Sequence, residues 1–136
     1  MVKRLMIGGA AALVLLAFSC AMLNAPMAPV KAHLKAWVGK DYETAYSYFS
    51  PELKDAISLE DFTAQAEGVL IKSFSLNSVS IKNSTAVVKG TVKLEDGRKW
   101  GCRYKLIQKD KDWVIYGYKV SPDVLFEEEE KGKEES

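Results

Sequence analysis

The spacing of apolar residues changes at Gly68, and this change constrains the fold more than any other feature of the sequence. Before Gly68, apolar residues recur at Val30, Leu34, Trp37 and Val38, which is the period of a helix with one buried face. After Gly68 they alternate, which is the period of a half-buried strand. This order predicts an α+β domain in which N-terminal helices pack on a curved four-stranded antiparallel sheet to form a cone.

Capping residues divide the helical part into four short helices. The first is expected from residue 30 to residue 38, after an extended spacer at 24–29 that contains two prolines. Asp41 is placed to cap the second helix. Ser50, which is followed by a proline, and Ser58 are placed to cap the third and fourth.

Four strands are expected at about 71–81, 86–94, 98–108 and 113–120. Short polar turns join them, as antiparallel hairpins require. In the second and third strands one face is apolar, formed by Ala86, Val88, Gly90, Val92, Leu94, Trp100, Cys102, Tyr104 and Leu106. In the fourth strand, the sequence leaves open which face meets the helices: the face of Val114, Tyr116, Tyr118 and Val120, or the face of Ile115, Gly117 and Lys119.

The N-terminus has the composition of an export signal. Lys3 and Arg4 precede an apolar run, which ends in the small residues Ser19, Cys20 and Ala21. The basic end of such a signal stays cytoplasmic, so the rest of the chain is predicted to lie outside the membrane. Residues 1–23 are therefore interpreted as a signal peptide or a membrane anchor.

Three alternatives for this segment stay open. Residues 16–20 resemble a bacterial lipobox, which predicts lipidation of Cys20. The apolar run also continues to Leu23, which approaches the ~20 residues of a spanning helix and fits an uncleaved anchor. Cleavage after Ala21 would release a soluble protein. The first two alternatives place the protein at the cell envelope, on the extracytoplasmic side of the membrane.

Charge separates the folded body from the C-terminus. Residues 21–126 hold 15 Lys/Arg and 12 Asp/Glu, a net +3, whereas residues 127–136 hold six acidic and two basic residues, a net −4. Residues 30–122 are interpreted as the folded domain and residues 123–136 as a disordered acidic tail. The lysines are scattered singly along the strands, so nucleic acid is not an expected partner.

No residues form a recognisable catalytic or metal-binding motif. His33, the only histidine, lies among lysines and is interpreted as a solvated surface residue. The aspartates fall mostly at helix starts and turns, where capping accounts for them. Cys102 is predicted to be a small buried hydrophobe that does not pair with Cys20. No metal ion or other cofactor is therefore expected.

Several phrases carry a resemblance to a known superfamily. These are residues 39–50 (GKDYETAYSYFS), residues 58–62 (SLEDF), the strand phrase STAVVKGTV and the phrase DGRKWGCRYKLIQKDKDWVIYGYKV. Residues 30–120 resemble the nuclear transport factor 2-like superfamily, and most of all its small domains in bacterial lipoproteins and membrane-anchored proteins. The resemblance implies a cone of helices and a bent sheet, but no single function.

The sequence therefore favours a non-enzymatic extracytoplasmic binding or interaction module. An apolar small ligand, an envelope protein or a second copy bound through the sheet are the expected partners, besides the membrane itself. The alternative is an isomerase-like or dehydratase-like enzyme that uses the interior of the cone. The residues expected to line a pocket or an interaction surface are Tyr46, Trp100, Cys102, Tyr104, Tyr116 and Tyr118.

Overall fold

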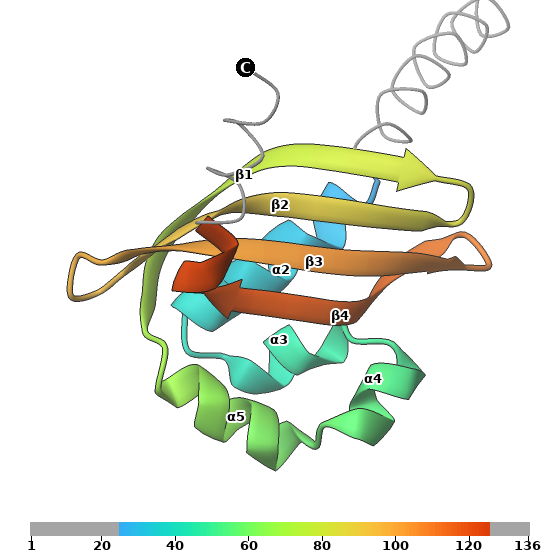
Figure 1. Ribbon diagram of the computed structural model, residues 1–136. Coiled ribbons are helices and arrows are strands. Elements are labelled where there is room, and N and C mark those ends of the chain that lie inside the picture. The colour runs from blue at the N-terminus through green and yellow to red at the C-terminus, as the bar shows by residue number, and fades with distance from the viewer. Residues whose placement is uncertain (1–24, 126–136) are drawn as a thin grey trace, which may run out of the picture.

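The computed structural model describes residues 25–125 (Figure 1). The predicted signal segment, Cys20 and most of the predicted acidic tail lie outside these residues. Four helices come first: α2 (Met27–Val38), α3 (Tyr42–Ser47), α4 (Pro51–Ala56) and α5 (Leu59–Glu67). Four strands follow: β1 (Ile71–Lys82), β2 (Thr85–Leu94), β3 (Lys99–Lys109) and β4 (Asp112–Ser121). The predicted α+β order is confirmed.

The strands form one antiparallel sheet in the order β1-β2-β3-β4. Helix α2 lies behind this sheet, and α3, α4 and α5 close one end of the cone (Figure 1). The loop between α3 and α4 is tied to β4 by two backbone hydrogen bonds. Ser50 N donates to Ile115 O at 2.7 Å, and Ile115 N donates to Tyr48 O at 3.0 Å.

The three predicted caps are present. The side chains of Asp41, Ser50 and Ser58 accept hydrogen bonds from the backbone N–H groups at the starts of α3, α4 and α5. The start of α2 was predicted wrongly, because the helix begins at Met27 instead of residue 30. Pro29 then lies in the first helical turn, where a missing N–H costs no hydrogen bond.

The predicted inward set is confirmed in β2 and β3, where all its members are buried except the half-buried Trp100. In strand β4, residues of both alternate sets face the helices, one set on each side of a bulge. Ile115 pairs with Leu106 and Tyr118 pairs with Tyr104, but Tyr116 has no partner between them. Such a β-bulge shifts the alternation by one residue. Neither of the two alternate sets of residues in β4 therefore faces the helices along the whole strand.

Gly90 allows β1 to bend closely over β2. A Cβ atom at this position would lie 2.2 Å from the carbonyl oxygen of Ser75. The β1–β2 register also shifts between Leu76 and Ser78. A bulge beside a glycine bends a strand, and here it produces the curvature on which the helices pack.

The chain after β4 returns onto the sheet as one helical turn at 122–125. Val124 in this turn is only 1% exposed, although the sequence placed it in the disordered tail. It packs over Gly101, whose missing side chain leaves room for the turn. The ordered body therefore extends past the predicted boundary at residue 122. Within residues 25–125 no helix is long and apolar enough to cross a membrane.

Candidate functional site

His33 is buried inside the cone, which corrects the prediction that it is a surface residue. Its Nδ1 lies 2.8 Å from Ala45 O, and its Nε2 lies 3.0 Å from the Tyr104 hydroxyl. A carbonyl oxygen only accepts, so Nδ1 carries the proton and Nε2 accepts from Tyr104. Burial lowers the pKa of His33 to about 4, while its hydrogen bond to Ala45 acts in the opposite direction.

The position of His33 in α2 explains its burial. Val30, His33, Leu34 and Trp37 are the buried residues of this helix, and they follow the i, i+3, i+4, i+7 spacing of one helical face. The lysines near His33 in sequence point to other sides of the helix. The helical spacing was thus the signal that could have placed His33 in the core.

Aromatic rings fill the space around His33. Its ring centroid lies 5.2 Å from that of Tyr104 and 5.3 Å from that of Phe49. Tyr118 stacks on both Phe49 and Tyr104, and Phe62 meets Phe49 edge-on. His33 and Tyr104 have no exposed surface. The pair is therefore a hydrogen-bonded part of the core to which solvent has no access.

The other predicted pocket residues are spread over several environments. Tyr46 is half-buried, and its hydroxyl donates to Ile57 O at 2.7 Å. Trp100 and Tyr118 are also half-buried, whereas Tyr116 is 40% exposed at the bulge. The structure therefore brings Tyr104 and Tyr118 together in the core but does not gather the set around one pocket.

Cys102 is a fully buried free thiol, as predicted. Burial raises the pKa of Cys102 to about 12, and a backbone hydrogen bond with Gly90 only partly offsets this effect. A thiol with such a pKa is almost entirely protonated at neutral pH and reacts slowly. Among the described residues there is also no group of three side chains suited to hold a metal ion.

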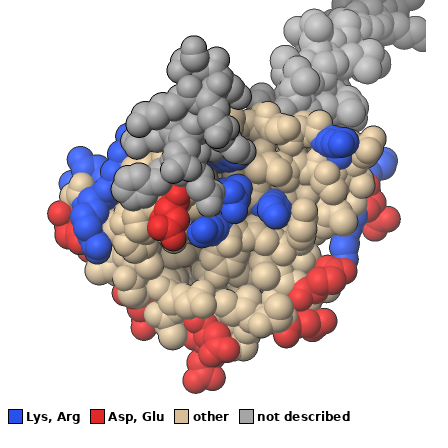
Figure 2. Space-filling model, in the orientation of Figure 1, with Lys and Arg blue, Asp and Glu red and all other residues tan. Residues whose placement is uncertain are grey.

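The outer face of the sheet has a different composition, and no sequence prediction singled it out. Register places Ser73, Ser75, Ser78 and Ser80 of β1 outward, and it places Lys89, Thr91, Lys93, Lys99, Arg103, Lys105 and Lys119 outward on β2, β3 and β4. Asp112, which pairs with Lys109 next to the β3–β4 turn, is the single Asp or Glu at the outward strand positions between Ile71 and Ser121. Blue side chains accordingly gather over the strands in Figure 2, while most red ones lie toward the helical end.

Three of these cations form one row across the sheet, because Lys89 pairs with Arg103 and Arg103 pairs with Lys119. Side chains in such directly opposed positions lie close together on the same face. Ser78 extends the row on β1. We call Lys89, Arg103 and Lys119 the cationic row. None of the three is without an interaction partner.

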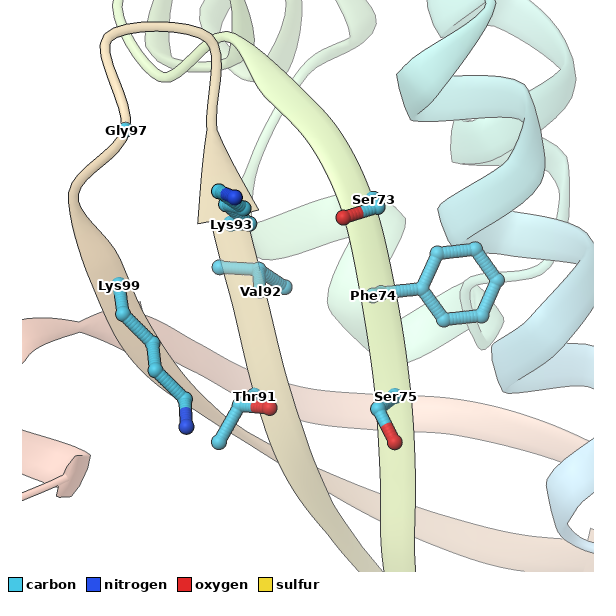
Figure 3. Close-up of a pocket in the computed structure, with 8 residues that line it drawn as sticks. All are labelled: Ser73, Phe74, Ser75, Thr91, Val92, Lys93, Gly97 and Lys99. Carbon is cyan, nitrogen blue, oxygen red and sulfur yellow. The ribbon is translucent and has the colours of Figure 1, made fainter.

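A shallow depression of about 360 Å³ lies next to the cationic row (Figure 3). Lys93 lines it and pairs with Ser73 on one side and Lys99 on the other. The hydroxyl groups of Ser75 and Thr91 border it, whereas the Phe74 ring points away toward the helices. Ammonium and hydroxyl groups both donate hydrogen bonds, so this part of the surface suits an anion.

Comparisons with known proteins agree with this fold. The model of the family described as a domain of unknown function, DUF4864, matches residues 27–127. No curated protein matches the chain. The fold is similar to that of a SEC-C motif containing protein from Rhodopseudomonas palustris, which is 17% identical, with 70% of this chain and 77% of that chain covered and a TM-score of 0.58.

Two nuclear transport factor 2-like structures are also similar. One, of unknown function from Shewanella oneidensis, is 18% identical over 73% of this chain and 98% of its own, with a TM-score of 0.56. The other, from Cytophaga hutchinsonii, is 13% identical, with 70% of this chain and 93% of that chain covered and a TM-score of 0.53. The resemblance found in the sequence is thereby confirmed, and at these identities it concerns the fold.

Proposed function

Because the chain belongs to the DUF4864 family, whose function is unknown, we propose a function from the chemistry of its surface. The protein is a non-enzymatic extracytoplasmic interaction module, held at the membrane by its N-terminus. It binds an acidic segment of an envelope protein on the outer face of its sheet. The gathering of cations on this face, with the cationic row and the neighbouring pair of Lys93 and Lys99, is the observation that carries this proposal.

Repulsion within the cationic row opposes folding, and a role in binding would explain why these cations are present. Like charges that are directly opposed on neighbouring strands destabilise a sheet by a few tenths of a kcal/mol per pair. An extended acidic segment could lie along the row and neutralise these charges. The serines of β1 would supply further hydrogen-bond donors at its border.

The aromatic residues support this choice of partner. An apolar ligand was expected in the interior of the cone or on the sheet, but Tyr104 is buried and Tyr118 packs against Phe49. A second copy that docked face to face through the sheet would bring two cationic rows together. An acidic partner avoids both problems.

The interior of the cone supports a role without catalysis. Both ring nitrogens of His33 are hydrogen-bonded, and Tyr104 donates to one of them, so neither group is free to exchange a proton with a substrate. Aromatic rings occupy the space around the pair. Acid–base catalysis in the cone would need an acid or base that a substrate can reach.

Binding of a fluorescent hexaglutamate peptide to the full-length protein in detergent tests the proposal. The native glutamates at positions 127–130 carry the same charge as the probe and could compete with it. The measurement therefore includes a variant with Gln at these four positions, called the Gln variant below. In the Gln variant, Lys93→Glu with Lys99→Glu should weaken binding about tenfold. Both lysines are exposed, so these changes should leave the fold intact.

The matched control is Lys31→Glu with Lys35→Glu, which makes the same change in net charge on exposed residues of α2. The proposal requires this control to bind within about twofold of the parent. An equal loss in both double variants would show attraction by net charge alone. Binding to phosphatidylglycerol vesicles without binding to the peptide would assign the face to lipid. Either result rejects the proposal.

The anchor is proposed separately and has its own measurement, the intact mass of the protein purified from membranes. A chain that starts at Cys20 and carries a diacylglyceryl group and an acyl chain would establish a lipoprotein. The mass of the full-length chain would establish an uncleaved anchor. A chain that starts after Ala21 would reject anchoring by the N-terminus.

A further inference from the structure

The C-terminal turn lies on the same face as the cationic row. A Cβ atom on Gly101 would lie 2.7 Å from Leu125 N and 2.9 Å from Val124 Cβ. Gly101 is an outward position of β3 and pairs with Thr91 and Ser121. The short turn is visible across the front of the sheet in Figure 1. Within the described residues, the chain thus ends on the outer face.

The distance from this turn to the cationic row is short. Arg103 is two residues from Gly101 along β3, which corresponds to about 7 Å. Four consecutive glutamates, Glu127–Glu130, begin two residues after Leu125. An extended chain advances about 3.3 Å per residue, so these glutamates can reach every member of the row.

Charge makes this segment a fitting occupant. The outward strand positions between Ile71 and Ser121 hold many cations and one carboxylate, Asp112, which pairs with Lys109 eight residues from Gly101 along the sheet. The turn at 122–125 adds one acidic residue, the exposed Asp123. Just after the turn, Glu127–Glu130 place four negative charges next to one another in the sequence. Alternating carboxylates of an extended segment can face the row on one side.

We propose that Glu127–Glu130 docks on the cationic row and covers it as an intramolecular competitor of acidic partners. The docking stands by itself, whereas the role as a competitor rests on the proposed function. Gly101 positions the segment, because it lets the preceding turn lie directly on the sheet. The outer face would then be accessible to a partner only when the segment is displaced.

Lysine acetylation of the full-length protein in detergent, read at each residue by mass spectrometry, tests the docking. The expected result is that Lys89 and Lys119 react about fivefold faster in the Gln variant than in the wild type. Lys31 and Lys35 on α2 should react equally in both. Sodium chloride at about 1 M should raise the wild-type rates to those of the variant, because it screens exposed ion pairs. Equal rates at Lys89 and Lys119 in the two proteins at low salt would overturn the docking.

A pair of glycine variants tests the path of the chain without changing any charge. Gly101→Ala should displace the turn and expose Lys89 and Lys119 as the Gln variant does, because its Cβ would overlap Val124 and Leu125. Gly117→Ala, on the same face of β4, should react like the wild type. Its Cβ would meet only the Lys105 side chain, at the ordinary distance of 3.8 Å. If both variants keep wild-type rates, the turn does not hold the segment on the row and the proposal is wrong.

Hexaglutamate binding separates this proposal from the proposed function. If both are right, the Gln variant binds the peptide about tenfold more tightly than the wild type. Faster acetylation of the Gln variant without peptide binding would support the docking and reject the proposed function. Equal peptide binding by both proteins, with equal acetylation, would support the function and reject the docking.

Discussion

The two faces of the sheet are built from alternate residues of the same strands, yet they differ in almost every property. The inner face buries Val88, Cys102 and Tyr104 against α2 and the rings of Phe49 and Phe62. The outer face carries serines, threonines, cations, a few aliphatic residues and the C-terminal turn. The contrast separates the residues of the hydrophobic core from the charged residues that face solvent.

Polar groups show the difference most clearly. On the inner face the buried polar pair of His33 and Tyr104 is neutral and hydrogen-bonded, as burial requires. On the outer face, three cations are aligned in positions where their repulsion opposes folding. Cations that repel one another on an open face are better candidates for binding an anion than a neutral pair in the core.

The largest expected effect of a single substitution lies on the inner face. Phe62→Ala should lower the free energy of unfolding by about 3–5 kcal/mol, because Phe62 is fully buried among Trp37, Phe49 and Tyr118. Urea unfolding followed by tryptophan fluorescence measures the change. Tyr116→Ala, at the exposed bulge, should cost less than about 1 kcal/mol. Similar losses for both variants would contradict the separation of the two faces.

The sequence predicted the inner face well because periodicity reports burial directly. The switch at Gly68 and the caps at Asp41, Ser50 and Ser58 were enough for the fold. His33 was predicted wrongly because its lysine neighbours were weighed above its angular position on α2. The two faces of β4 could not be resolved, because a bulge depends on how two strands meet and leaves no clear pattern in one of them.

The second prediction concerns pH and tests whether His33 belongs to the core. Its pKa is about 4 in the folded protein and about 6.5 in the unfolded chain, so between these values the unfolded state binds more protons. The free energy of unfolding is therefore highest above pH 6.5 and decreases as the pH is lowered. At pH 4 the loss is about 3 kcal/mol. Chemical unfolding between pH 4 and pH 7.5 measures this slope.

His33→Gln provides the control, because it removes the only histidine of the sequence without adding another titratable group. The difference in unfolding free energy between the wild type and this variant should shrink as the pH falls. The lowered pKa values of Glu52 and Asp96, caused mainly by hydrogen bonds to Lys109 and Arg98, keep these exposed carboxylates charged through most of this range. A difference that stays constant would mean that His33 binds its proton as easily in the folded protein as in the unfolded chain.

The outer face could not be predicted as a site, because its residues become neighbours only through strand pairing. Lys89, Arg103 and Lys119 are separated by 14 and 16 positions in the sequence, and each has uncharged residues on both sides in its own strand. Their alignment depends on the β2–β3 and β3–β4 registers, and the bulge at Tyr116 brings Lys119 opposite Arg103. A change of one residue in register would turn Lys119 to the other face.

The smallest effect is expected on the outer face and concerns the cationic row. In the Gln variant, Lys89→Ser and Arg103→Ser should show a repulsive coupling of about 0.2–0.5 kcal/mol in a double-mutant cycle of unfolding free energies. The coupling should vanish in about 1 M sodium chloride. Lys89→Ser combined with Lys99→Ser should show no coupling, because Lys99 pairs with Lys93 and lies four residues from Arg103. In the wild type, glutamates that bind both Lys89 and Arg103 would offset the repulsion, so the coupling should be smaller or change sign. Equal repulsion in both backgrounds would mean that the acidic segment does not bridge the row.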